Sequence, residues 1–329
     1  MSSSHLPPLP FHVLSAFAPT SGTGSQAALV IYPSNTDPRW LDDRYLLKVA
    51  GDFGYTATVH LAPSGKEGEE GEWEIRWFTA KSELALCGHG TISTSYILFQ
   101  QYPHMNTLRY INPIAGRFQS TRLEVPLSSS ASSSSSNEVE ISLPSLPQEV
   151  LRSMGSGTPH EDGKGLRDAL GVGEDEVLDI SEFKYGVHKS LIVLVKGEVG
   201  LRELQVDIRG LGEIASGQII ITQISPESES SDNLVIKSRM FAPGIGIQED
   251  TITGSAHTYL TNYYLLTPAS RFLPHKFQQN PSGVTIQATQ LSERGGGMKC
   301  ILGEGNRTVR LIGKVREFGK GFLVDDDDV

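Results

Sequence analysis

The sequence has little of what marks secreted, zinc-binding or membrane proteins. Only two cysteines occur among 329 residues, too few for a disulfide framework or for a closed zinc site with four ligands. No apolar run is long enough to span a bilayer, and residues 1–10 lack the basic start and apolar stretch of a signal peptide. We therefore expect a cytoplasmic protein without a metal and without a membrane partner.

Positive charge is also scarce. The formal net charge is −10, and much of the acid lies in short clusters at residues 67–74, 227–232 and 325–328. Such clusters are typical of solvated loops and of a frayed terminus. Binding to nucleic acid requires a basic stripe that neutralises phosphates, so a nucleic-acid partner is not expected.

Length and one serine tract predict two domains. A chain of 329 residues exceeds the size at which a single core usually stops growing. Residues 128–136 are almost pure serine, and such a tract cannot bury apolar surface. We predict an N-terminal domain over residues 1–126, a disordered linker over 127–137, and a C-terminal domain over 138–329 whose last strands can return to the first domain.

Hydrophobic patterning favours an α+β fold, because short strands alternate with few helices. Helical spacing of apolar residues predicts helices near 40–50, after 90, over 166–170 and after 254, and apolar or alternating runs predict strands near 11–14, 27–32, 57–61, 73–79, 190–195, 218–224 and 234–241.

Two segments of the chain resemble each other. In residues 78–91 and again in residues 241–257, a strand ends in Phe, an acid precedes a Gly by five positions, and small residues open a helix. Cys87 of the first segment takes the place of Thr253 in the second. A repeat about half a chain long indicates a duplicated domain, because solenoid repeats have much shorter periods.

The repeated turn suits the binding of an anion. Glycine lets the backbone approach a ligand closely, and the free N–H groups of a helix's first turn attract negative charge. Two such turns that face each other would hold a carboxylate and stabilise the charge that develops when its α-proton leaves. The predicted substrate-binding residues are Gly88, Gly90, Thr91, Thr253, Gly254, Ser255 and, from the argument below, Thr56.

These turns carry a family resemblance. Residues 86–91, Leu-Cys-Gly-His-Gly-Thr, resemble the first active-site turn of the diaminopimelate epimerase and proline racemase superfamily. Residues 239–257 are similar, more closely, to the signature of its PhzF (phenazine biosynthesis-like) branch, and weaker similarities at 24–30 and 290–296 extend the resemblance over nearly the whole chain except the serine tract.

The resemblance implies a diaminopimelate epimerase-like fold of two pseudosymmetric domains, each a mixed sheet or barrel around one central helix. It implies an isomerase or epimerase that needs no cofactor and no metal. Members of the superfamily remove and return a proton on small molecules, often amino-acid-like acids. We expect this chemistry in a cleft between the domains, on a small-molecule acid, with a homodimer as a possible assembly.

Three residues are predicted to be catalytic. Cys87 stands at a helix start that favours the thiolate, and a thiolate is a competent base. His89 lies between two glycines at the same helix start, where imidazole stays neutral and can donate or shuttle a proton. Asp250 matches the acid before the Thr-Gly-Ser turn. Because Thr253 replaces the second cysteine of the superfamily's racemases, a symmetric two-thiol mechanism is not expected.

The resemblance fails at one catalytic position. The PhzF branch carries a glutamate in a short turn before an early strand, and the matching segment here places Thr56 at or near that position. The nearest carboxylate in the sequence is Asp52. Two alternatives to an isomerase therefore stay open: a dehydratase of related chemistry, and a catalytically silent member of the family that binds a ligand or a protein.

Overall fold

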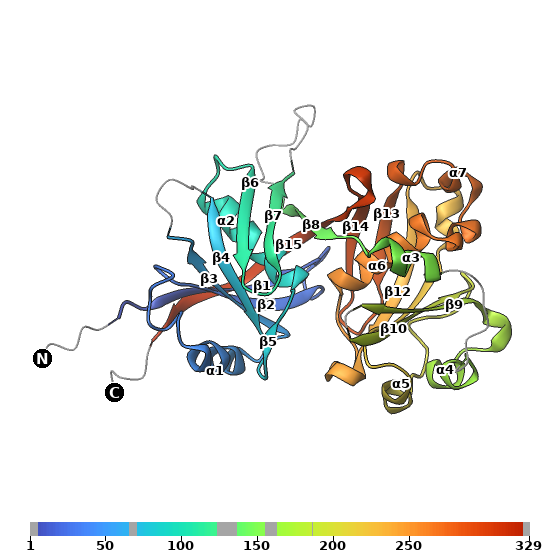
Figure 1. The fold of residues 1–329 in the computed structure, drawn as a ribbon, viewed down its shortest axis with the longest axis horizontal. Helices are drawn as coiled ribbons and strands as arrows, with labels where there is room; N and C mark the ends of the chain where they lie inside the picture. The colour runs from blue at the N-terminus through green and yellow to red at the C-terminus, as the bar shows by residue number, and fades with distance from the viewer. Residues whose placement is uncertain (1–5, 66–70, 124–136, 155–162, 186, 325–329) are drawn as a thin grey trace, which may run out of the picture. The chain divides into compact units, whose positions relative to one another are not determined.

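The computed structural model describes residues 6–65, 71–123, 137–154, 163–185 and 187–324 (Figure 1). The serine tract, the acidic tail at 325–328 and part of the acidic cluster at 67–74 lie outside the described residues. The chain forms two compact units. Unit 1 comprises residues 1–21, 25–141 and 313–329, and unit 2 comprises residues 22–24 and 142–312.

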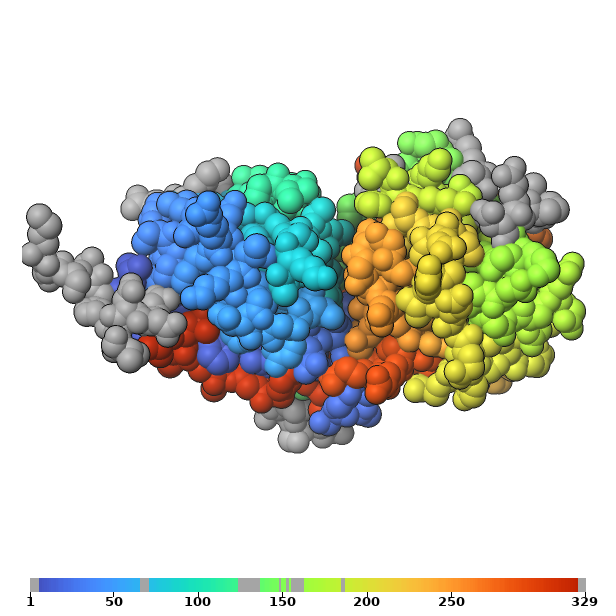
Figure 2. All heavy atoms as spheres, turned by 90° about the horizontal axis from the view of Figure 1, so that it is seen from below, coloured from blue at the N-terminus to red at the C-terminus, as the bar shows by residue number. Residues whose placement is uncertain are grey.

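Unit 1 contains a closed sheet of eight strands. Each strand pairs with the next in the order given below, and β15 also pairs with β1, which closes the ring. A two-residue strand, β5 (Glu83–Leu84), pairs with β4 outside this ring. The second half of β15 lies at the surface, red in Figure 2. The eight strands are β1 (Leu9–Ala16), β2 (Ser25–Ile31), β3 (Ala57–Pro63), β4 (Glu72–Phe78), β6 (Thr107–Asn112), β7 (Gly116–Arg122), β8 (Glu138–Pro144) and β15 (Thr308–Leu323).

Helix α2 (Gly88–Gln101) is the central helix of unit 1. Nine of its 14 residues are buried, and it contacts β1, β2, β3 and β7. Most of its buried hydroxyls are satisfied locally, since Thr94 donates to the carbonyl of Gly90 at 2.9 Å and Ser95 to that of Thr91 at 2.8 Å, whereas Ser93 Oγ has no hydrogen-bond partner among the described residues. Such bonds let a largely polar helix lie inside a sheet. Helix α1 (Asp43–Phe53) contacts β3 and β4.

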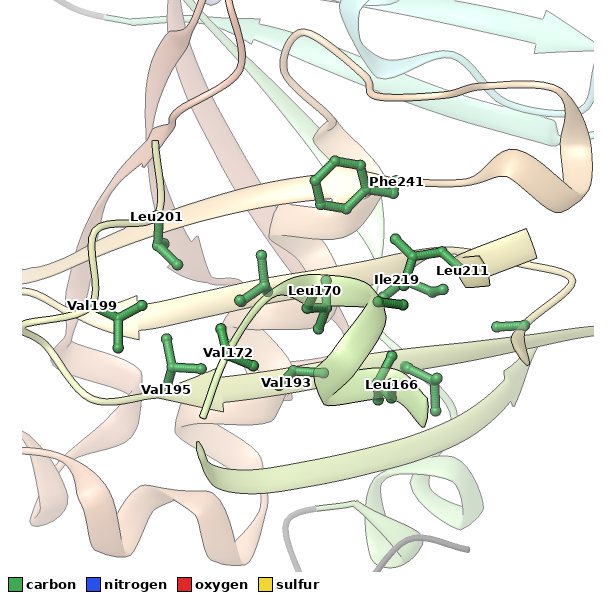
Figure 3. Packing of buried hydrophobic residues seen from close by; sticks show 14 residues of the cluster. Leu166, Leu170, Val172, Val193, Val195, Val199, Leu201, Leu211, Ile219 and Phe241 are labelled. Carbon is green, nitrogen blue, oxygen red and sulfur yellow. The ribbon is translucent and has the colours of Figure 1, made fainter. Parts of the chain in front are cut away.

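Unit 2 wraps a second sheet around a second helix. Ten of the 13 residues of α6 (Gly254–Leu266) are buried. Helices α4 (Gly163–Leu170) and α5 (Ile208–Ile214) pack on the sheet through the cluster in Figure 3, where Leu166 and Leu211 meet Val193 and Ile219. The strands run β9 (Val177–Tyr185), β10 (His188–Val195), β11 (Ile219–Ile224), β12 (Leu234–Phe241), β13 (Thr285–Gln290), β14 (Gly296–Leu302) and the first residues of β15.

The two units repeat one pattern of strand pairing. In unit 1, β1–β2, β3–β4, β6–β7 and β7–β8 are antiparallel, whereas β2–β3 and β4–β6 are parallel across α1 and α2. In unit 2, β9–β10, β11–β12, β13–β14 and β14–β15 are antiparallel, whereas β10–β11 and β12–β13 are parallel across α5 and α6. The predicted α+β class, with a mixed sheet around a central helix in each pseudosymmetric half, is confirmed.

The predicted elements differ from the observed ones mainly in their boundaries, but the predicted strands leave out β6, β7, β9, β13, β14 and β15. The helix predicted over residues 40–50 begins at Asp43, because the Asp42 side chain accepts the backbone N–H of Arg44 and caps it. The prediction missed α5 and the short helices α3 (Gln148–Ser153) and α7 (His275–Gln278). No helix in the described ranges is long and apolar enough to cross a bilayer. The expectation that the two helix starts face one cleft stays a prediction.

Candidate functional site

The start of α2 brings together Cys87, His89 and Thr56. Cys87 is the N-cap residue of this helix and is 4% exposed, and its Sγ accepts the backbone N–H of Gly90 at 3.3 Å. A Cβ atom at position 90 would lie 2.9 Å from Val59 Cγ2 and 3.0 Å from Trp77 Cδ1. Glycine at this position therefore lets the helix start pack directly on β3 and β4.

His89 contacts both of the other side chains. Its Nδ1 lies 3.5 Å from Cys87 Sγ, and its Nε2 lies 3.3 Å from Thr56 Oγ1. Burial lowers the pKa of His89 to about 4, so the imidazole is neutral at neutral pH. The Thr56 hydroxyl donates to the carbonyl of Gln26 at 3.0 Å and can only accept from His89. This favours a proton on Nε2 of His89. Cys87 Sγ also lies 3.7 Å from Nε2, so the sulfur is nearly equidistant from the two ring nitrogens.

Thr56 is held by its own contacts at the N-terminal end of β3. Besides its bond to Gln26, its hydroxyl lies 3.2 Å from Ser25 Oγ. The side chain is exposed. The position at which the sequence resemblance expects a glutamate is therefore adjacent to His89, and a hydroxyl occupies it. Asp52, the carboxylate nearest in sequence, is an exposed residue of α1.

In unit 2, Asp250 and Thr253 form the turn before α6. Thr253 Oγ1 donates to Asp250 Oδ2 at 2.5 Å, and the backbone N–H of Thr251 donates to Asp250 Oδ1 at 2.8 Å. Burial raises the pKa of Asp250 more than these two donors lower it, and the charge of Glu249 adds to the rise. A carboxylate with a raised pKa can hold or release a proton nearer to neutral pH than an ordinary aspartate can.

Ser255 has a partner that the sequence did not predict. Gln218, immediately before β11, donates from Nε2 to Ser255 Oγ at 2.8 Å. Ala57 is the first residue of β3 and pairs with Ala27, and Ile219 is the first residue of β11 and pairs with Leu191. Gln218, directly before β11, is therefore equivalent to Thr56, directly before β3. Ser255 likewise stands where His89 does, one residue after the first glycine of its helix. Each half thus joins a strand-start polar side chain to a helix-start polar side chain.

A second missed residue is Gln290, the last residue of β13. It is fully buried, and it contacts both the main chain of the Asp250–Thr253 turn and the Thr253 side chain. The sequence contains a signal for it. Ile286 and Ala288 are apolar at alternate positions, and Gln290 is the next position on this face, which is the buried face of β13. A polar residue in the buried phase of a strand needs specific partners.

The acid that precedes a glycine by five positions in both repeated segments, Glu83 or Glu249, has a structural role. Glu83 binds Arg76 through two hydrogen bonds of 2.8 and 2.6 Å, and Glu249 binds Arg239 in the same way at 2.7 and 2.9 Å. Each arginine also stacks, 5.0 Å from the ring centre, on the Phe that ends its strand. Both pairs fix the loop that leads to a helix start. Glu249 is therefore committed to Arg239, while Asp250 beside it belongs to the turn.

Other predicted or considered residues are bound within the fold. The Thr91 hydroxyl donates to the carbonyl of Cys87 at 2.8 Å and is fully buried. His257 Nδ1 donates to the carbonyl of Thr253 at 2.7 Å, and burial lowers its pKa to about 4. Cys300 lies in β14, where burial raises its pKa to about 12. Gly88 and Gly254 are the first residues of α2 and α6.

Comparison with known proteins gives consistent results. The family model described as "Phenazine biosynthesis-like protein" matches residues 14–320. An uncharacterized isomerase of Pseudomonas aeruginosa is 29% identical over 299 residues, covering 91% of this chain and 92% of that protein. A phenazine biosynthesis protein of the PhzF family from Enterococcus faecalis has the same fold, with a TM-score of 0.71 at 23% identity over 97% of this chain and all of that one. A hydroxyproline epimerase from Agrobacterium vitis shares the fold more distantly, with a TM-score of 0.56 at 10% identity over 98% and 94% of the two chains.

Proposed function

Because the chain belongs to the phenazine biosynthesis-like family, we propose that it moves a proton on a small carboxylate or carbonyl metabolite by acid–base catalysis without a cofactor. At the level of the family the chain is an isomerase, the class named for its bacterial relatives. The observation that carries the finer proposal is the contact between the Cys87 thiol and the neutral His89 at the start of α2.

The proposed reaction needs a base, an acid and a site for negative charge. Cys87 Sγ lies 3.5 Å from Nδ1 and 3.7 Å from Nε2 of His89. A rotation of the imidazole that points the Nδ1 lone pair at the sulfur lets it accept the thiol proton and leave a thiolate. The thiolate then removes the carbon-bound proton and becomes a thiol again. The first N–H groups of α2 stabilise the resulting enediolate, an effect worth several kcal/mol in preorganised sites.

Asp250 is proposed as the group that returns the proton. Burial raises the pKa of Asp250, which favours its protonated form. In the proposed step this carboxylic acid protonates the carbanionic carbon and becomes a carboxylate. Thr253 holds Oδ2 in place. After turnover, Asp250 regains a proton and the His89–Cys87 pair loses one to solvent, so that no net proton is consumed.

The test is solvent exchange at carbon. Matched 2-amino and 2-hydroxy acids are incubated with the protein in deuterated water, and incorporation of deuterium is followed by NMR. Cys87→Ala, His89→Ala and Asp250→Asn should each slow exchange roughly 100- to 10,000-fold. Cys300→Ala, which removes the other buried thiol, is the matched control and should exchange at the parent rate. Parent-like exchange in all three site variants would refute the proposed site.

A second candidate function is ligand binding without turnover. The observation that favours it is the Thr56 hydroxyl, which contacts His89 where the family resemblance expects a glutamate. Thr56 is exposed, so Thr56→Glu can be accommodated. A parent that shows no exchange, together with a Thr56→Glu variant that gains it, would establish the silent alternative. Exchange by the parent excludes this alternative.

A further inference from the structure

Gln290 reaches the acid turn of unit 2 from a strand that follows it by 40 residues. Its Oε1 accepts the backbone N–H of Thr253 at 3.0 Å, and its Nε2 donates to the carbonyl of Asp250 at 2.7 Å. The same Nε2 lies 3.4 Å from Thr253 Oγ1. One side chain thus binds both ends of the turn. Only an amide can do this, because the turn offers one donor and two acceptors to the same group.

These contacts fix the direction of the Thr253 hydroxyl. Because the amide of Gln290 donates to Thr253 Oγ1, the hydroxyl uses its own proton for Asp250 Oδ2, 2.5 Å away. The three groups form a short chain of donors that ends on the carboxylate. A donor aimed at a carboxylate favours its ionised form and holds the oxygen in one orientation.

We propose that Gln290 is a positioning residue for Asp250, and that it acts by holding the Thr253 hydroxyl as a donor to the carboxylate. The inference rests on the proposed function only in giving Asp250 a role in proton transfer, since the hydrogen-bond chain itself is independent of activity. Gln290 does not act on the substrate.

The other groups beside the turn do not replace this control. Glu249 is bound by Arg239 through two hydrogen bonds. His257 Nδ1 donates to the carbonyl of Thr253, and its Nε2 lies 3.4 Å from Ser238 Oγ. Ser292 Oγ donates to the carbonyl of Thr251 at 2.6 Å. These contacts fix the main chain, whereas Gln290 alone among the described residues also contacts the Thr253 hydroxyl that binds Asp250.

The experiment measures the titration of Asp250 directly. The full chain is labelled with ¹³C at the aspartate carboxyl carbons, and the Asp250 signal is assigned by its loss in Asp250→Asn. Gln290→Met removes the donor at similar volume, and Gln290→Glu replaces it with a group that cannot donate and that repels the carboxylate. The midpoint of the Asp250 titration should rise by about 1 pH unit in Gln290→Met and further in Gln290→Glu.

A matched control separates this effect from general damage to unit 2. Gln223, the second-last residue of β11, is also buried, and its amide donates to the carbonyl of Gly197. Gln223→Met should leave the Asp250 midpoint unchanged. An unchanged midpoint in both Gln290 variants, or an equal shift in Gln223→Met, would overturn the inference. Failure of the proposed function gives a different result. Asp250→Asn would then exchange deuterium at the parent rate, while the Gln290 variants would still shift the Asp250 midpoint.

Discussion

Acid should destabilise unit 1 through one buried histidine, His60 in β3. Its side chain is fully buried, Nε2 donates to the carbonyl of Leu46 at 3.1 Å, and Nδ1 accepts the Tyr32 hydroxyl at 2.9 Å. Both ring nitrogens are therefore used by the neutral form. Burial lowers the pKa of His60 to about 3, and the nearby charge of Arg76 contributes to the shift.

The sign and the size of the effect follow from proton linkage. The unfolded chain binds a proton at His60 below a pKa of 6.5, whereas the folded chain does so only near 3. The stability that neutral His60 contributes is therefore complete above pH 6.5 and is lost as the pH falls toward 3. At 1.36 kcal/mol per unit, the loss between pH 7 and pH 4 is about 3 kcal/mol.

The variant that isolates this term is His60→Gln, whose amide can donate to Leu46 and accept from Tyr32. All three tryptophans of the chain, Trp40, Trp73 and Trp77, belong to unit 1, so their fluorescence in urea reports the unfolding of this unit. The free energy of unfolding should fall about 3 kcal/mol less in the variant than in the parent between pH 7 and pH 4. His104→Gln, at an exposed residue of unit 1, is the control. Parallel pH profiles for parent and His60→Gln would refute the reasoning.

Three further outcomes are expected. Gly90→Ala should destabilise unit 1 by about 1–3 kcal/mol, because the new methyl group would meet Val59 and Trp77; a parent-like urea midpoint by tryptophan fluorescence would contradict this packing. Arg239→Met should cost about 2 kcal/mol by calorimetry, because it leaves the half-buried Glu249 unpaired, whereas Arg209→Met, at an exposed pair, should change stability by less than about 0.5 kcal/mol. Tyr263→Phe removes the 2.7 Å hydrogen bond to the buried Asp179 and should lower stability by about 1–3 kcal/mol; an unchanged melting temperature would show that Asp179 has no need of it.

The sequence predicted well where apolar periodicity is strong. The strand predicted over residues 234–241 is β12, the helix predicted after residue 90 begins two residues earlier at Gly88, and the helix predicted after residue 254 begins at Gly254. The prediction missed helices that have little apolar surface of their own. Helix α5 has seven residues, of which only Leu211 is buried, and it is held by the Asp207 cap and by packing on α4. Such helices depend on tertiary contacts more than on local pattern.

Motifs found the polar residues of the site only in part. Cys87, His89, Asp250 and Thr253 lie in contiguous turns and could be read from the sequence. Gln218 precedes β11 and Gln290 ends β13, and they reach Ser255 and Asp250 only through folding, across 37 and 40 residues. No local spacing encodes such pairs, because their separation along the chain depends on the length of the intervening elements.

The duplicated fold places different chemistry on equivalent scaffolds. Two related strand starts carry Thr56 and Gln218, and two related helix starts carry His89 and Ser255. The main-chain pattern that positions these side chains is common to both units, since the strand pairings and the anchoring arginine–glutamate pairs recur. The side chains at these strand starts and helix starts can differ between the units, because the pairing of the strands does not depend on them. A thiol and an imidazole stand at the helix start of one unit, and a carboxylate and hydroxyls at that of the other, so the two helix starts are chemically unequal. The proposal of one proton-removing and one proton-returning unit depends on this inequality, because two identical bases would need two equal helix starts.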